Sequence, residues 1–145
     1  MMQLNPYLFF DGQCEAAFRF YETILGGKIV AMMTNEAAPE GAEMPAADKE
    51  AWRKKIMHAR LVLGETVLMG SDTPPSCHEA AKGFFVTLNI ADAATAERVF
   101  HALGEGGAVR MPIAETFFAH RFGMLVDRFG IPWMVNCEKA AAAAA

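Results

Sequence analysis

A histidine and an arginine interrupt an otherwise apolar stretch that runs from Ile56 to Leu63. Alternation along a strand places His58 and Arg60 on one face and leaves the other face free to pack on a helix. Imidazole exchanges protons near neutral pH, and guanidinium offers a forked donor to a carboxylate or phosphonate. The pair therefore predicts a small-molecule site. In the alternative to ligand binding, His58 has only a structural role and Arg60 pairs with Glu138.

A second polar group lies in the loop before the penultimate predicted strand. Glu115 and His120 are candidates for a base and an acid there, because loops on a rigid sheet frequently carry chemistry. Phe117, between them, is expected to contact a ligand. In the alternative interpretation Glu115 only forms an ion pair with Arg121 or Arg128.

Methionine is abundant, with ten residues in the chain. Thioethers fill irregular cores and also line adaptable pockets, and both interpretations stay open. Met134 and Asn136 share the face of the last strand that points away from its core residues. Met69 and Ser71 lie near the end of an earlier strand. An apolar surface with a few polar groups is the usual composition of a small-molecule site, so we expect these four residues to contact a ligand.

These side chains need a scaffold, and the hydrophobic pattern predicts strand, helix and three strands in the first half. Asp11 is the expected cap of the helix, and Gly26 with Gly27 ends it. The stretch 34–55 is a predicted loop with one helical turn near 48–53. The expected strands are 4–10, 28–33, 56–63 and 66–71. The apolar stripe of the helix is Cys14, Ala17, Phe18, Tyr21, Ile24 and Leu25.

The second half repeats this order at a period of roughly eighty residues. Asp92 is the expected helix cap, and Gly130 is expected to supply the positive φ of a turn that begins at Asp127. The fold class is therefore α+β, with two tandem β-α-β-β-β modules and helices on one face of an antiparallel-rich sheet. The expected strands are 84–90, 109–113, 122–127 and 131–138. The expected division is module one 3–71, linker 72–83 and module two 84–139.

Composition narrows the class of protein. With 145 residues, 53% of them hydrophobic, and a net charge of −4, the chain fits one globular domain, 1–139, and lacks the basic excess of a nucleic-acid binder. No apolar run is long enough to span a membrane. Three widely spaced cysteines argue against a disulfide framework, which favours the cytoplasm. The alanine run 140–145 is expected to be an artefact or to stand for unassigned residues.

Three segments together resemble the PhnB-like branch of the vicinal-oxygen-chelate superfamily, which also contains glyoxalase I, extradiol dioxygenases and bleomycin-resistance proteins. They are YLFFDGQCEAAFRFYETILGG from Tyr7, the strand with His58-Ala-Arg-Leu that leads to Met69-Gly-Ser-Asp, and AETFFAHRFGMLVDRFGIPWMVNCEK from Ala114. The resemblance implies that the sheet curls into a ligand-binding cup, with the helices on its outer face, and that the protein is a homodimer.

Metal-dependent members of that superfamily carry histidine or glutamate at four equivalent strand positions. The resemblance places Pro6, Met69, Phe85 and Met134 there, and none of these suits a hard divalent cation. Their neighbours Tyr7, Gly70, Phe84 and Trp133 do not replace the missing ligands. We therefore expect no metal and no other cofactor.

Three functions are consistent with these residues. The first is metal-independent binding of a small organic molecule, with acid–base chemistry by His58, Glu115 or His120 left open. The second is sequestration without catalysis, as in the bleomycin-resistance branch. The third is a metal-dependent lyase or dioxygenase. Some relatives carry the name demethylubiquinone methyltransferase, but this sequence has no glycine-rich loop between a strand and a helix in a Rossmann context.

Overall fold

The structure is a computed structural model, and it describes residues 1–37 and 49–139. The chain divides into two compact units, Met1–Glu79 and Ala80–Ala145, whose boundary falls inside the linker expected at 72–83. Residues 38–48 of the expected loop, and the alanine run 140–145, lie outside the described residues. Within the described part, no helix is long and apolar enough to cross a membrane.

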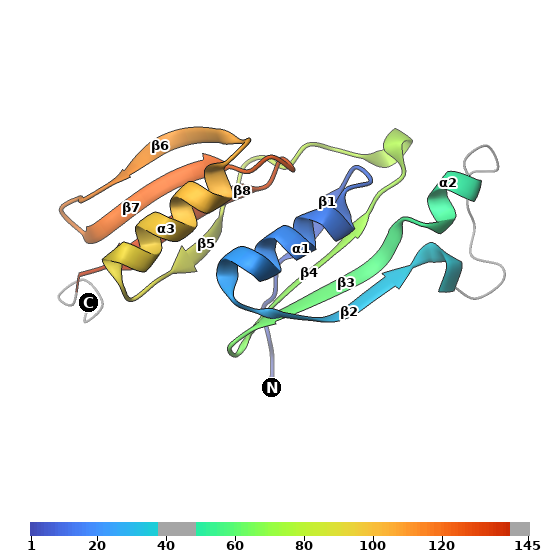
Figure 1. Cartoon of the computed structure of the whole chain (residues 1–145), viewed down its shortest axis with the longest axis horizontal. Helices are drawn as coiled ribbons and strands as arrows, with labels where there is room; N and C mark the ends of the chain where they lie inside the picture. The colour runs from blue at the N-terminus through green and yellow to red at the C-terminus, as the bar shows by residue number, and fades with distance from the viewer. Residues whose placement is uncertain (38–48, 140–145) are drawn as a thin grey trace. The chain divides into compact units, whose positions relative to one another are not determined.

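The first unit is a four-stranded mixed sheet with one long helix packed on it (Figure 1). The strand order is β1-β4-β3-β2, in which β1 runs parallel to β4 and the other neighbours are antiparallel. The long elements are β1 (Tyr7–Phe10), α1 (Cys14–Leu25), β2 (Lys28–Thr34), β3 (Ile56–Leu63) and β4 (Thr66–Asp72). Short helices are η1 (Asn35–Ala37), α2 (Lys49–Arg53), close to the expected turn, and η3 (Pro75–Cys77).

The second unit repeats this topology, with strand order β5-β8-β7-β6 and β5 parallel to β8. The order of elements along the chain is again strand, helix and three strands, so the predicted α+β fold of two β-α-β-β-β modules is confirmed (Figure 1). The elements are β5 (Val86–Asn89), α3 (Ala93–Gly104), β6 (Ala108–Ala114), β7 (Ala119–Val126) and β8 (Pro132–Glu138).

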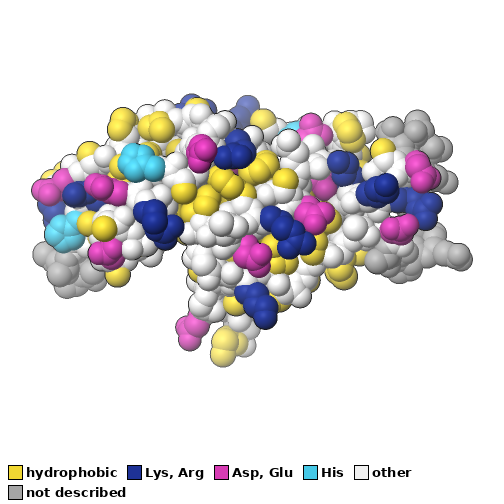
Figure 2. Space-filling view, viewed as in Figure 1, with side chains coloured by type: hydrophobic (Ala, Val, Ile, Leu, Met, Phe, Trp, Pro, Cys, Tyr) yellow, Lys and Arg dark blue, Asp and Glu magenta, His cyan; other side chains and the backbone are white. Residues whose placement is uncertain are grey.

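Each unit has its core between the helix and one face of the sheet. In α1 the predicted stripe is buried from Cys14 to Ile24, and Phe18 and Tyr21 have no exposed surface. Full burial of such a side chain is worth roughly 1.5–3 kcal/mol. The solvent side of both helices carries acidic and basic side chains (Figure 2). The helix of each unit packs on one face of its sheet, and the opposite face of the first sheet carries exposed side chains such as Tyr7 and Phe9.

The two helices begin differently. Asp92 caps α3 as predicted, and its carboxylate accepts a hydrogen bond from the Thr95 backbone N–H at 2.8 Å. The prediction that Asp11 caps α1 is wrong, because the helix starts after Gln13 without a side-chain cap. The buried carboxylate of Asp72 accepts from the Cys14 N–H at 2.9 Å instead. A distant strand thus supplies the acceptor that the local sequence lacks.

Candidate functional site

Strand β3 presents its two polar residues on the face that the helix does not cover. Ala59 and Leu61 are at most 1% exposed under α1, whereas His58, Arg60 and Val62 are all half-buried. Because side chains alternate along a strand, His58 and Arg60 point away from α1. This agrees with the expected faces of the strand.

The sheet register brings most of the expected ligand contacts of the first unit together. Arg60 lies opposite Met69 on β4, and Met69 lies beside Tyr7 on β1. Ser71, one alternation further along β4, lies beside Phe9. Met33 on β2 is the partner of His58. We call this surface the first open face: Tyr7, Phe9, Met33, His58, Arg60, Met69 and Ser71.

His58 is held by Tyr7. The tyrosine hydroxyl lies 3.3 Å from Nδ1 of His58, and the two rings stack at 5.9 Å with an interplanar angle of 28°. The contact orients the imidazole. The tautomer of His58 decides whether Nδ1 donates to the tyrosine hydroxyl or accepts from it, and Nε2 is left for a ligand. Tyr7 was missing from the sequence prediction, because the parallel pairing that places it here is not a local property.

Arg60 is a half-buried cation that has no counter-charge among the described residues. It forms no ion pair or hydrogen bond with a described residue, whereas Arg19, Arg53 and Arg121 each pair with a glutamate. Burial of an unpaired charge is unfavourable, so the position suits an anionic partner. The alternative pairing with Glu138 joins residues of different units and stays a prediction.

The second unit has an equivalent open face on β5, β7 and β8. Met134 lies between Thr87 and Met124, and Asn136 lies between Asn89 and Phe122. The Asn136 amide donates to the Asn89 side-chain oxygen at 3.1 Å, while its own buried oxygen has no hydrogen-bond partner in the described residues. Met134 and Asn136 therefore share one surface, as expected.

The catalytic candidates are divided between the two units, with His58 in the first and Glu115 and His120 in the second. Glu115 is 64% exposed, and its carboxylate lies 3.5 Å from the Lys139 ammonium rather than in an ion pair with Arg121 or Arg128. Arg121 instead bonds Glu97 at 2.6 Å, and this hydrogen bond raises its pKa. His120 is exposed and lines an open hollow of about 470 Å³ with Glu138 and Asn89.

The aromatic residues of this loop form a short stack. Phe117 is 94% exposed, and its ring meets Phe118 edge-on at 5.2 Å. Phe118 in turn meets Phe122 at 5.1 Å. Phe117 thus lies at the solvent end of the stack, and a contact with a ligand stays a prediction.

The placement of the four superfamily metal positions stays a prediction. The strand register shows only which residues are neighbours there: Met69 lies beside Tyr7, and Met134 lies beside Thr87. In the described ranges 1–37 and 49–139, no three His, Cys, Asp or Glu side chains are grouped to hold a metal ion.

Comparison with known proteins agrees with the fold. Residues 2–136 match the family model described as 3-demethylubiquinone-9 3-methyltransferase. Protein YjdN of Escherichia coli (strain K12) is 32% identical over 142 residues, which cover 95% of this chain and 97% of YjdN. The crystal structure of protein PA1353 from Pseudomonas aeruginosa is 48% identical, with a TM-score of 0.84 and coverage of 95% of this chain and 98% of that one.

A more distant solved structure has the same fold. It is a putative 3-demethylubiquinone-9 3-methyltransferase, PhnB protein, from Bacillus cereus, which is 23% identical with a TM-score of 0.74. The alignment covers 94% of this chain and 99% of that one. The chain therefore belongs to the family described as 3-demethylubiquinone-9 3-methyltransferase, the PhnB-like branch of the vicinal-oxygen-chelate superfamily.

Proposed function

We propose that this protein binds a small, partly apolar organic anion on the first open face, without a metal ion. The observation that carries the proposal is the half-buried Arg60, which has no acidic partner among the described residues. A carboxylate or phosphonate can accept two hydrogen bonds from its guanidinium. His58, oriented by Tyr7, supplies a further polar contact two residues away.

The remainder of the surface suits an apolar body. Phe9 is 55% exposed and Met33 41%, and both lie on the same face as the two polar groups. Aromatic rings and thioethers bind apolar groups of varied shape. Ser71 and Met69 lie between the aromatic residues of β1 and the polar residues of β3. This arrangement supports a ligand with one charged end and one apolar end.

Binding without catalysis is the function that the geometry favours. Acid–base catalysis normally combines two positioned groups, and His58 is the only histidine, aspartate or glutamate among the residues that define the first open face. Glu115 and His120 belong to the second unit, and Glu115 is already ion-paired. We therefore place binding, including sequestration of a toxic compound, before an enzymatic role.

Methyl transfer, which the family description names, is not part of the proposed function. Both sheets are mixed, with one parallel pair each, instead of the doubly wound parallel sheet that carries a Rossmann glycine-rich loop.

The three cysteines are free thiols, which supports a reducing compartment such as the cytoplasm.

Calorimetry and thermal shift on EDTA-treated protein test the proposal. Benzoate, phenylphosphonate and hexanoate serve as probes, with benzamide as the uncharged control. We expect at least one anion to bind and benzamide not to bind. Arg60→Gln should weaken binding at least about tenfold, since a hydrogen bond to a charged group is worth ~1.5–3 kcal/mol.

Arg110→Gln is the matched control, because Arg110 is an exposed strand arginine of the second unit that pairs with no described residue. Its affinity should equal that of the wild type. Equal loss in both variants, or binding that survives Arg60→Gln, contradicts the proposed site. Binding that appears only after a divalent metal is added contradicts metal independence.

A further inference from the structure

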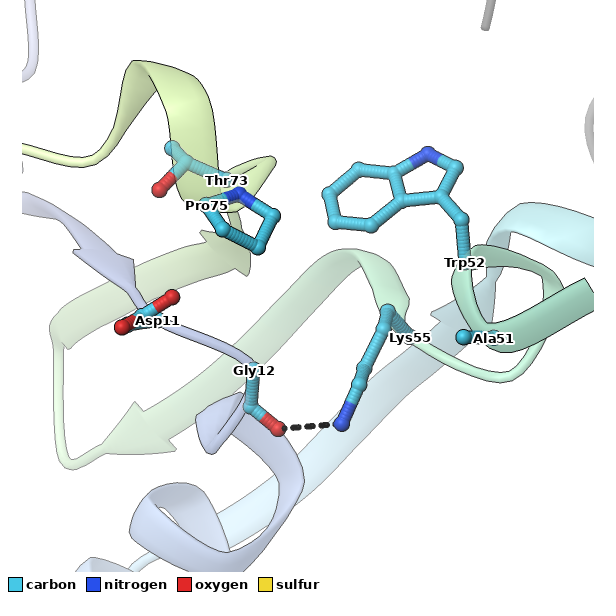
Figure 3. Close-up of a pocket in the computed structure, with 7 residues that line it drawn as sticks. All are labelled: Asp11, Gly12, Ala51, Trp52, Lys55, Thr73 and Pro75. Carbon is cyan, nitrogen blue, oxygen red and sulfur yellow. Dashed lines mark hydrogen bonds between the residues drawn. The ribbon is translucent and has the colours of Figure 1, made fainter. Parts of the chain in front are cut away.

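A cavity of about 270 Å³ lies away from the first open face, at the end of the sheet where β1 and β4 stop and β3 begins. Three separate segments form it: the turn after β1, the helix α2 with the residue before β3, and the chain after β4. We call it the Trp52 cavity (Figure 3). Its lining includes Asp11, Gly12, Trp52, Lys55, Thr73 and Pro75.

The cavity contains one cation and one carboxylate that do not neutralise each other. The half-buried Lys55 ammonium donates to the Gly12 carbonyl at 3.0 Å and forms no ion pair with a described residue. Two of its three protons therefore remain for a ligand. Asp11 has no hydrogen bond or ion pair in the described chain, and it lines the cavity on the other side of Gly12 from Lys55 (Figure 3). Both charges are thus available to a bound molecule.

The apolar part of the lining comes from two rings. The Trp52 indole and the Pro75 ring border the cavity from opposite segments of the chain (Figure 3). The Trp52 carbonyl is fixed by the Asn35 side-chain amide at 3.1 Å and by the Lys55 N–H at 3.0 Å. An aliphatic or aromatic group can therefore pack on an indole whose backbone is already held in place.

We propose that the Trp52 cavity binds a zwitterion of the α-amino acid class with an apolar side chain. Lys55 binds the carboxylate, Asp11 binds the ammonium, and the side chain packs on Trp52 and Pro75. A simple acid would leave its charge beside the Asp11 carboxylate, and a simple amine would leave its charge beside Lys55. The cavity is close to the lower end of the volumes typical of small-molecule sites, which limits the ligand to a single small molecule.

This site is separate from the one proposed for the organic anion. It lies at the end of the sheet instead of on its open face, and it shares no lining residue with that face. Arg60→Gln should therefore leave binding in the Trp52 cavity unchanged, and either proposal can fail without the other.

Tryptophan emission gives a direct readout, because the chain has two tryptophans. The other one, Trp133, is buried in the second unit, where its indole N–H donates to Asp127 at 2.9 Å. Titration with L-leucine should change the emission of the wild type and of Arg60→Gln. Trp52→Phe should abolish the change and keep the Trp133 emission.

Two analogues of leucine separate the charges. 4-Methylpentanoate keeps the carboxylate, and leucinamide keeps the ammonium; each should bind at least about tenfold more weakly than leucine. Lys55→Gln should weaken leucine binding by a similar factor. Asp11→Asn should remove the preference for leucine over 4-methylpentanoate, and because Asp11 is exposed this variant should fold normally.

The proposal is overturned if calorimetry and emission detect no leucine or phenylalanine binding at about 10 mM, well above a millimolar dissociation constant. It is also overturned if 4-methylpentanoate binds as tightly as leucine, because Asp11 then has no role. If Lys55→Gln does not fold, the Asp11→Asn and Trp52→Phe variants still decide the question.

Discussion

Two half-buried cations of the first unit, Lys55 and Arg60, have no acidic partner in the described chain. The half-buried cations Arg121 and Lys139 of the second unit each pair with a glutamate. Both unpaired cations are half-buried, and burial removes part of the hydration that would otherwise compensate their charge. At the scale of single residues, these two positions are therefore where we expect ligand carboxylates to bind.

A buried carboxylate of the first unit, that of Asp72, bonds the backbone of two separate elements. Asp72 is 6% exposed and accepts from two backbone N–H groups, that of Cys14 at 2.9 Å and that of Ile56 at 2.8 Å. It joins the start of α1 to the start of β3. Burial and the nearby Asp72 charge raise the pKa of the Cys14 thiol, so this thiol stays protonated and inert near neutral pH.

Asp72→Asn should lower the free energy of unfolding by about 2–3 kcal/mol. The amide has one acceptor oxygen, so one of the two buried N–H groups would face an NH₂ group without a partner. Urea denaturation measures the change. Asp11→Asn is the control and should stay within ~0.5 kcal/mol of the wild type, because Asp11 is an exposed residue. Equal stability of the two variants would show that Asp72 does not anchor the helix.

The roles of single residues were predictable from the sequence only where they depend on neighbours in the chain. The faces of His58 and Arg60 follow from alternation within one strand, and the Asp92 cap follows from the three residues after it. Asp72 could not be identified in this way, because its partners are 58 and 16 residues distant. Nothing in the residues next to Asp72 indicates that an acidic side chain at the end of this strand anchors a helix.

At the scale of elements, periodicity predicted the helices and strands but not their pairing. The buried residues of α1 match the predicted stripe as far as Ile24, and β2 to β4 and β6 to β8 lie near the expected ranges. The pairing of Tyr7 with Met69 depends on which edge β1 joins, and a bulge between Ile29 and Ala31 shifts the β2 register. Helix α2, which carries Trp52, was foreseen only as a helical turn within a polar loop.

Close packing of α1 on the first sheet depends on Gly70. A Cβ atom there would lie 2.8 Å from both the Leu8 carbonyl oxygen and Cε1 of Phe18. Backbone atoms cannot move aside cheaply, so Gly70→Ala should lower the free energy of unfolding by about 1–3 kcal/mol. Chemical denaturation with circular dichroism measures it.

Gly104→Ala is the matched control for this prediction. Gly104 is the last residue of α3, and a Cβ atom there would meet Leu125 at an ordinary 3.7 Å. Alanine also favours helix over glycine by up to ~1 kcal/mol. We expect stability equal to or above that of the wild type. A loss as large as that of Gly70→Ala would point to a general intolerance of added volume.

At the scale of the whole molecule, the internal repeat gives the chain two related sheets with different chemistry on their open faces. The first carries Arg60 and His58, and the second carries Asn136 and Glu138 next to methionines. The repeat itself was visible in the sequence as a matching order of elements. The chemical difference explains why ligand binding by one face does not imply the same ligand for the other.

Both open faces also expose apolar side chains, and exposed apolar surface marks interaction sites. Phe9, on the first open face, is 55% exposed, and Phe85, which directly precedes β5, is 37% exposed. Strands β2 and β6 are edge strands within their own sheets. We therefore expect a homodimer, with a mass by light scattering at micromolar concentration of twice that of one chain. Phe85→Glu should raise the dimer dissociation constant about tenfold or more, since a buried carboxylate without a partner is costly. Ala16→Glu, on the solvent side of α1, adds the same charge and should leave the dimer intact. A wild type of single-chain mass, or equal weakening by both variants, contradicts an interface formed by the open faces.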